Sequence, residues 1–216
     1  SVESTHACAL HTSGQVNCWG IERAGEVSGT PTSSTFSQID TGYWRSCGVH
    51  TDGSIECWGY SGDGIASGVP TGTDFIQVDV ARTHACAVDT AGEVICWGTD
   101  THNQLEPSTR ADAIEQISGG WSHTCILEDG YPVCTGDIEQ TTLPDELGSL
   151  SAIDAGHWHT CARQTDARAV CWGRDDHGQS TPPDDLDVLQ ISAGGAHSCA
   201  VDTARDLVCW GDNSSG

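Results

Sequence analysis

Twelve cysteines are the residues of this 216-residue chain whose spacing most clearly indicates chemistry. They fall into six pairs, with nine or ten residues from the first cysteine to the second. In residues 84–98, HACAVDTAGEVICWG, two alternating apolar runs flank a stretch with the composition of a tight turn. Cys86 and Cys96 would face each other across such a hairpin, with Cβ atoms roughly 4.5–5.5 Å apart, which is close to disulfide range.

Cysteines placed in this way can form disulfides or, with a neighbouring histidine, bind a metal. His84, Cys86 and Cys96 would share one face of the hairpin, and three ligands with an open position resemble a catalytic zinc site. Against zinc, the second hairpin has Arg45 in place of the histidine yet keeps both cysteines, and the usual Cys-x-x-Cys spacing is missing. We therefore expect no metal and no cofactor, and an oxidising compartment with six disulfides: Cys8–Cys18, Cys47–Cys57, Cys86–Cys96, Cys125–Cys134, Cys161–Cys171 and Cys199–Cys209.

The hairpin that positions each cysteine pair occurs six times. The leading cysteines recur at intervals of 39, 39, 39, 36 and 38 residues, and most hairpins follow another strand-like run such as FSQIDTG. Each unit thus has three or four short strands and no credible helix. Such a sheet cannot bury both faces alone, so we predict an all-β fold, a single β-propeller domain of six blades with one disulfide per blade. The repeats cover approximately residues 1–34, 35–73, 74–112, 113–148, 149–187 and 188–216.

The repeat also carries a specific pattern, Gly-x-x-His-[Ser/Thr]-Cys-Ala and then, after a turn, Val-x-Cys-Trp-Gly, with the best copies at residues 156–173 and 194–211. It resembles the regulator of chromosome condensation repeat in its short, cysteine-bearing bacterial form. The resemblance covers essentially the whole chain and implies a propeller of four-stranded blades. It implies little about function, because that superfamily includes nucleotide-exchange factors, enzyme inhibitors and many secreted proteins.

The number of blades has an alternative. From Trp19 to Cys47 the chain spans 28 residues, whereas the 6 residues after Trp210 and the 8 up to Cys8 give 14. A closed ring of six would lack about one strand and its loop, so a fragment of a seven-bladed propeller is the second hypothesis.

The charge excludes several partners. The chain has 31 acidic residues against 8 basic ones, all arginine, and a formal net charge of −23. This charge repels nucleic acid and anionic lipid surfaces, and no apolar run is long enough to cross a membrane. We expect a secreted or cell-surface protein whose acidic surface is either simply solvated or matched to a cationic partner or divalent ions.

Two sets of periodic residues are assigned to the scaffold. The histidines are expected to form hydrogen bonds within their own blades, and the tryptophans of the Trp-Gly pairs to fill the space between blades. The histidines are His6, His84, His123, His159 and His197, and the tryptophans are Trp19, Trp58, Trp97, Trp172 and Trp210.

Aromatic residues that do not recur are better candidates for binding. They lie between the leading strand and the hairpin, where equivalent loops share one face of a propeller, and repeats three and six lack them. Aromatic faces with polar neighbours suit sugar rings, cations or a protein contact, and exposed apolar area in loops indicates an interaction. The predicted ligand-binding residues are Tyr43, Trp44, Arg45, Trp121, His157 and Trp158.

Other chemistry has weaker support. Acidic pairs such as Asp175-Asp176, the Asp184-Asp185-Asp187 group and Asp145-Glu146 could serve a glycosidase or bind Ca²⁺, but composition alone produces such pairs. Asn213-Ser214-Ser215 fits the N-glycosylation pattern.

Three function hypotheses remain. The first is an extracellular or cell-surface, non-catalytic module that binds a protein or glycan. The second is a structural subunit that assembles through its incomplete terminal blade. The third is a secreted glycosidase or lyase.

Overall fold

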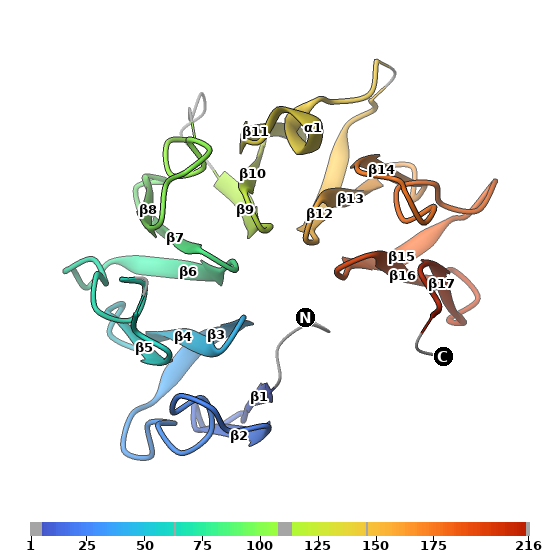
Figure 1. Ribbon diagram of the computed structural model, residues 1–216. Helices are drawn as coiled ribbons and strands as arrows, with labels where there is room; N and C mark the ends of the chain where they lie inside the picture. Colours follow the sequence, from blue (N-terminus) through green and yellow to red (C-terminus); the bar gives the residue numbers. More distant parts are fainter. Residues whose placement is uncertain (1–5, 63, 108–113, 146, 215–216) are drawn as a thin grey trace. The chain divides into compact units, whose positions relative to one another are not determined.

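The computed structural model describes residues 6–62, 64–107, 114–145 and 147–214. Within them, seventeen strands form six antiparallel sheets, one for each repeat (Figure 1). The first sheet has two strands and each of the other five has three. The helix α1, Ile138–Thr141, is a single turn in repeat four, and the side chain of Asp137 caps it by accepting a hydrogen bond from the amide of Glu139. The prediction of an all-β fold built from six short-stranded blades is confirmed.

The strands follow the predicted alternating runs. The first sheet consists of β1 (His6–Leu10) and β2 (Val16–Gly20), and the second of β3 (Phe36–Gly42), β4 (Arg45–His50) and β5 (Ile55–Gly59). The third consists of β6 (Phe75–Val80), β7 (His84–Asp89) and β8 (Val94–Gly98), and the fourth of β9 (Ile114–Gly119), β10 (His123–Glu128) and β11 (Tyr131–Gly136). The fifth consists of β12 (Leu150–Ala155), β13 (His159–Gln164) and β14 (Ala169–Gly173), and the sixth of β15 (Val188–Ala193), β16 (His197–Asp202) and β17 (Leu207–Gly211).

The chain forms two compact units, which divide between Asp100 and Thr101. The first unit holds the first three sheets and the second unit holds the last three.

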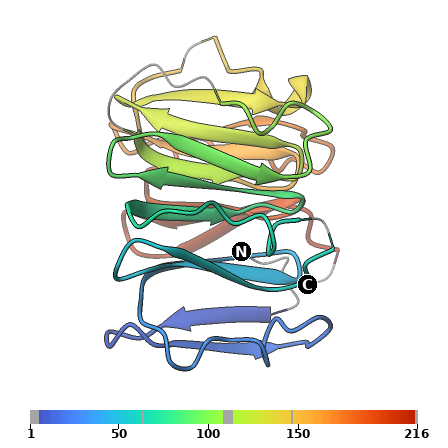
Figure 2. The same cartoon turned by 90° about the vertical axis from the view of Figure 1, so that its left-hand side faces the viewer.

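The six disulfides form as predicted. In every hairpin the two cysteines are direct register partners, as in Cys86 opposite Cys96, and their Cα atoms lie 4.0–4.1 Å apart. The hairpin of β1 and β2 is seen from the side in Figure 2. Because the sulfurs of all twelve cysteines are bonded to one another, none supplies a thiolate to a metal.

The core of each unit lies between consecutive sheets. The middle strand of a sheet forms hydrogen bonds on both edges, and in β7 and β10 all six residues are buried. In the first unit Val49 of β4 packs with Val78 of β6, and in the second unit Leu127 of β10 packs with Ile153 of β12. The apolar faces that no single sheet can bury are thus covered by the next sheet along the chain.

The tryptophans of the Trp-Gly pairs also lie between sheets, with one exception. Each belongs to an apolar cluster that contains the disulfide of the preceding sheet: Trp58 with Cys8 and Cys18, Trp97 with Cys47 and Cys57, Trp172 with Cys125 and Cys134, and Trp210 with Cys161 and Cys171. The prediction is wrong for Trp19, which is 56% exposed. Trp19 belongs to the first sheet, and no sheet precedes it within the described residues.

Three of the five periodic histidines bind to the next sheet, so for these three the prediction of bonds within their own blades is wrong. The ring Nε2 atoms lie 2.7–2.9 Å from a hydroxyl that follows the first residue of the next middle strand. In the second unit a glycine three residues before the histidine leaves room for the ring. A Cβ on Gly156 would lie 2.7 Å from Cε1 of His159, and one on Gly120 would lie 2.1 Å from Cε1 of His123. The pairs are His6 with Ser46, His123 with Thr160, and His159 with Ser198.

The connections after the Trp-Gly pairs take part in the same junctions. The indole of Trp58 donates to the carbonyl of Glu26 at 3.2 Å and that of Trp97 to the carbonyl of Ile65 at 2.8 Å. The sequence analysis missed this buried position, although a periodic signal was present: it follows the tryptophan of a Trp-Gly pair by seven residues. It is occupied by Glu26, Ile65, Gln104 and Gln179, all at most 1% exposed.

Candidate functional site

The turn between β3 and β4 holds the first group of predicted site residues. Tyr43 and Trp44 are stacked, with ring centroids 4.5 Å apart and planes inclined by 27°. Trp44 has a φ of +64°, which is unusual for a side chain of its size and places its ring beside Tyr60, 5.9 Å away and edge-on. The sequence analysis did not include Tyr60, which follows β5.

Arginines surround these three rings. The guanidinium carbon of Arg82 lies 4.3 Å from the centroid of Tyr43, and that of Arg23 lies 5.4 Å from the centroid of Trp44. Both distances are within the range of cation–π attraction. We call Tyr43, Trp44, Tyr60, Arg23 and Arg82 the first aromatic cluster.

Arg45, a predicted ligand-binding residue, has another position. Its side chain is 1% exposed, and Nη1 donates to the backbone carbonyl of Arg82 at 2.7 Å. Its guanidinium also lies 5.7 Å from the centroid of Tyr60. Arg45 is therefore a buried support of the first aromatic cluster. The positive charges at the surface of the cluster belong to Arg23 and Arg82.

A second cluster forms in the second unit from the turns that precede β10 and β13. Trp121 and Trp158 are stacked, with centroids 4.6 Å apart and planes inclined by 23°, and His157 is edge-on to both at 4.9 and 5.1 Å. The backbone amide of Trp121 donates to the carbonyl of His157 at 3.1 Å, which ties the two turns together. The guanidinium of Arg174 lies 5.1 Å from the centroid of Trp158. We call Trp121, His157, Trp158 and Arg174 the second aromatic cluster.

The predicted site residues lie in two groups, one in each unit. In both, the aromatic residues named from the sequence lie together, and none of them is either fully buried or fully exposed. The arginines of the clusters were not among the predicted residues. Arg23, Arg82 and Arg174 are three of only eight positive residues, which was the available signal, but only Arg174 follows a Trp-Gly pair directly in the sequence.

The clusters concentrate positive charge in an acidic protein. Together with Arg45 they contain four of the eight arginines of a chain whose net charge is −23. Arg174 forms an ion pair with Asp176, whose carboxylate binds Nε. A half-buried aromatic stack beside a guanidinium can bind the apolar face of a sugar ring while the guanidinium binds a carboxylate or sulfate.

The acidic groups have local structural roles. Asp175 accepts hydrogen bonds from the amide of Ser180 and the hydroxyl of Thr181, both at 2.7 Å. Among the described residues no three His, Cys, Asp or Glu side chains are placed to hold a metal ion. Glu146 and Ser215, which complete one acidic pair and the glycosylation pattern of Asn213, lie outside the described residues.

Part of the chain is similar in sequence to a known family of repeats. Residues 151–179 and 188–216 match the family model described as "Regulator of chromosome condensation (RCC1) repeat". The fifth and sixth repeats of the chain thus match the RCC1 repeat. The implied β-propeller fold is confirmed by similarity to solved propeller structures across nearly the full length of the chain. No curated protein sequence matches the chain.

Two similar structures are ectodomains of plant receptor kinases. The ectodomain of CR4 from Physcomitrella patens has a TM-score of 0.84 and 25% identity over 99% of this chain, and this chain covers 62% of that ectodomain. The CRINKLY WD40 ectodomain of ACR4 from Arabidopsis thaliana has a TM-score of 0.76 and 23% identity, with 96% of this chain and 76% of that chain covered.

A third similar structure is Prp20p from Saccharomyces cerevisiae, described with its binding to Gsp1p and histones. It has a TM-score of 0.74 and 15% identity, with 98% of this chain and 68% of that chain covered. At this identity the similarity concerns the fold alone. None of the helices described in the chain is long and apolar enough to span a membrane.

Proposed function

We propose that the chain is an extracellular, non-catalytic binding module in which each of the two aromatic clusters binds an acidic oligosaccharide. The observation that carries the proposal is the pairing of stacked aromatic rings with arginine in both clusters, within a chain that has only eight positive residues.

The ligand class follows from the charges. A guanidinium over an aromatic ring can form two parallel hydrogen bonds to a carboxylate or sulfate, while the ring faces take up the apolar side of a sugar. A net charge of −23 repels long polyanions at the same time. A short oligosaccharide with few negative charges, such as one that contains a uronic acid, satisfies both conditions.

The location follows from the disulfides. All twelve cysteines are paired and every sheet has one disulfide, which is typical of proteins that fold in an oxidising compartment. Two structures of the same fold are ectodomains of receptor kinases, which supports an extracellular location.

A glycan array followed by calorimetry of the strongest ligand tests the proposal. We expect neutral oligosaccharides to bind weakly and acidic ones to bind with an affinity that falls as salt is added. Arg174→Gln removes one charge-assisted hydrogen bond and should weaken binding by about 10- to 100-fold.

The matched control is Arg168→Gln. Arg168, like Arg174, forms an ion pair with an aspartate two residues away, in this case Asp166, but no aromatic ring of the described residues lies beneath it. We expect its substitution to leave binding unchanged. Equal effects of the two substitutions, or an array without any acidic ligand, would contradict the proposal.

A further inference from the structure

The connection after β14 fixes the backbone of Arg174, the arginine of the second aromatic cluster. The amide of Arg174 donates to the carbonyl of Trp158 at 2.8 Å, and its carbonyl accepts from the hydroxyl of Ser180 at 2.7 Å. The carboxylate of Asp175 accepts from the amide of the same Ser180 and from the hydroxyl of Thr181, both at 2.7 Å. These bonds close the connection into a loop that begins at the arginine.

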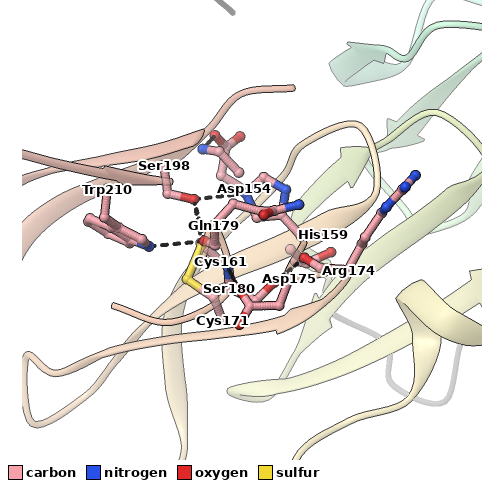
Figure 3. The surroundings of a disulfide bond; sticks show 12 residues. Asp154, His159, Cys161, Cys171, Arg174, Asp175, Gln179, Ser180, Ser198 and Trp210 are labelled. Atoms are coloured by element: carbon pink, nitrogen blue, oxygen red, sulfur yellow. Dashed lines mark hydrogen bonds between the residues drawn. A yellow bond between two sulfur atoms is a disulfide. The ribbon is translucent and has the colours of Figure 1, made fainter. Parts of the chain in front are cut away.

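The other end of this loop is anchored in the interior of the second unit. Gln179 is 1% exposed, and its carbonyl accepts from the indole of Trp210 at 2.9 Å and from the hydroxyl of Ser198 at 3.0 Å. Figure 3 shows these bonds, and it shows the side chain of Arg174 extending away from the disulfide Cys161–Cys171. The backbone is thus held at both ends of the loop, and what remains to be positioned is the arginine side chain itself.

Asp176 determines which edge of the guanidinium is offered to a ligand. Its Oδ2 accepts a hydrogen bond from Nε of Arg174. A guanidinium has five N–H donors in one plane, with a side edge formed by Nε and one Nη and an end edge formed by the two Nη atoms. Because Asp176 occupies Nε, the end edge is the one left for a ligand. The guanidinium carbon lies 5.1 Å from the ring centroid of Trp158, so a ligand at that edge would lie beside the aromatic stack.

This ion pair has little to contribute to folding. The side chains of Arg174 and Asp176 are 43% and 55% exposed, and exposed ion pairs add little to stability. For binding, the pair has two opposite effects. The negative charge of Asp176 weakens the attraction for an anion, whereas an arginine that is already held in place loses less freedom when the ligand binds. Immobilising one long side chain costs about 2- to 12-fold in affinity.

We propose that Asp176 is a positioning residue, which holds Arg174 over Trp158 and leaves its two Nη atoms for the carboxylate of the ligand. The ligand carboxylate then forms two parallel hydrogen bonds with the end edge of the guanidinium. This inference rests on the proposed function, because it describes how the second aromatic cluster binds an acidic oligosaccharide. Asp175 is next in the sequence and binds Ser180 and Thr181 instead, so it fixes the loop but not the guanidinium.

Two substitutions separate positioning from charge. Asp176→Asn and Asp175→Asn each remove one negative charge beside the second aromatic cluster, but only the first releases Arg174. An asparagine at position 175 can still accept from the amide of Ser180 and can donate to the hydroxyl of Thr181. Binding is measured by calorimetry with a trisaccharide that carries one terminal uronic acid. We expect Asp175→Asn to leave the affinity unchanged or to raise it by up to about 5-fold. Asp176→Asn should bind about 2- to 12-fold more weakly than Asp175→Asn.

The Nε–H signal of Arg174 in NMR spectra supplies a readout that charge alone would not change. Without ligand, the signal should be protected from exchange with water in the native chain and in Asp175→Asn, and it should lose this protection in Asp176→Asn. The melting temperatures of both variants should stay close to that of the native chain, because the ion pair is exposed.

The outcomes distinguish this inference from the proposed function. If Arg174→Gln weakens binding but Asp176→Asn binds as tightly as Asp175→Asn or more tightly, Asp176 acts through its charge alone. Positioning is then overturned, while the proposed function stands. A protected Nε–H signal in Asp176→Asn would overturn positioning as well. If Arg174→Gln leaves the affinity for the trisaccharide unchanged, the proposed function fails at this cluster and the inference fails with it.

Discussion

Acid should destabilise this protein through its buried histidines. The hydroxyl of Ser198 has one proton, which it donates to the carbonyl of Gln179 at 3.0 Å, so Nε2 of His159 must carry a proton and donate to Ser198. The other ring atom, Nδ1, is buried and has no hydrogen-bond partner among the described residues. A second proton there would be a buried charge, and burial, with a smaller effect of His197, lowers the pKa of His159 from 6.5 to about 4.

Nδ1 of His123 is also buried without a hydrogen-bond partner among the described residues, and burial lowers the pKa of His123 to about 3. Because the unfolded chain binds these protons more readily, stability is full above pH 6.5 and is lost as the pH falls toward the folded-state values. Between pH 7 and pH 5 each histidine should reduce the free energy of unfolding by about 2 kcal/mol.

Denaturant unfolding followed by tryptophan fluorescence at pH 7, 6 and 5 measures this loss. His159→Gln keeps a donor for Ser198 but cannot titrate, so it should remove the contribution of His159, about 2 kcal/mol, from the loss of stability between pH 7 and pH 5. His11→Gln, at an exposed histidine, is the matched control and should leave the dependence unchanged. A stability that is constant between pH 7 and pH 5, or a loss that His159→Gln does not reduce, would refute the assignment of a buried neutral ring.

Other predictions concern the scaffold. Trp97→Ala should lower the free energy of unfolding by about 3–5 kcal/mol, because the indole is buried between sheets, whereas Trp19→Ala should change it little. Gly156→Ala should prevent the ring of His159 from packing, and we expect a lower melting temperature than for Gly178→Ala, where a positive φ is strained but a Cβ meets no atom within 4 Å. Mass spectrometry after thiol labelling without reductant should find no free cysteine, and removal of any one disulfide should reduce stability by about 2–3 kcal/mol.

The repeating features of this fold could be predicted because each sheet has the same local sequence pattern, in which two alternating strands, a turn and a cysteine pair recur. The alternation around Cys86 and Cys96 and the turn between them determine which cysteines face each other, so register and disulfide followed directly. The junctions could not be predicted in the same way. Whether His123 reaches its own sheet or Thr160 of the next depends on how two sheets pack, and no period in a single repeat contains that information.

The clusters show a similar limit. Tyr43, Trp44 and Trp158 do not recur in every repeat, and this irregularity was enough to identify them as candidates. Other features of the clusters could not be predicted, because they depend on neighbouring turns that are close in space and distant in sequence. These features are the stacking of the rings, the positive φ of Trp44 and the position of Arg82 over Tyr43. Hydrogen bonds between sheets, such as that of Gln116 with Ile153, could not be predicted for the same reason. The Gln-Ile-Ser sequence occurs twice, and its role in joining two sheets is recognised only after the structure has shown it for one copy.

Indole NMR during titration with the strongest acidic oligosaccharide tests the binding proposal most directly. The Nε1–H signals of Trp44, Trp121 and Trp158 should move, and those of Trp121 and Trp158, which belong to one cluster, should give the same dissociation constant. Those of Trp97 and Trp210, which already donate to backbone carbonyls between sheets, should not move. A titration that shifts the second group, or neither group, would contradict the claim that the aromatic clusters are the binding surface.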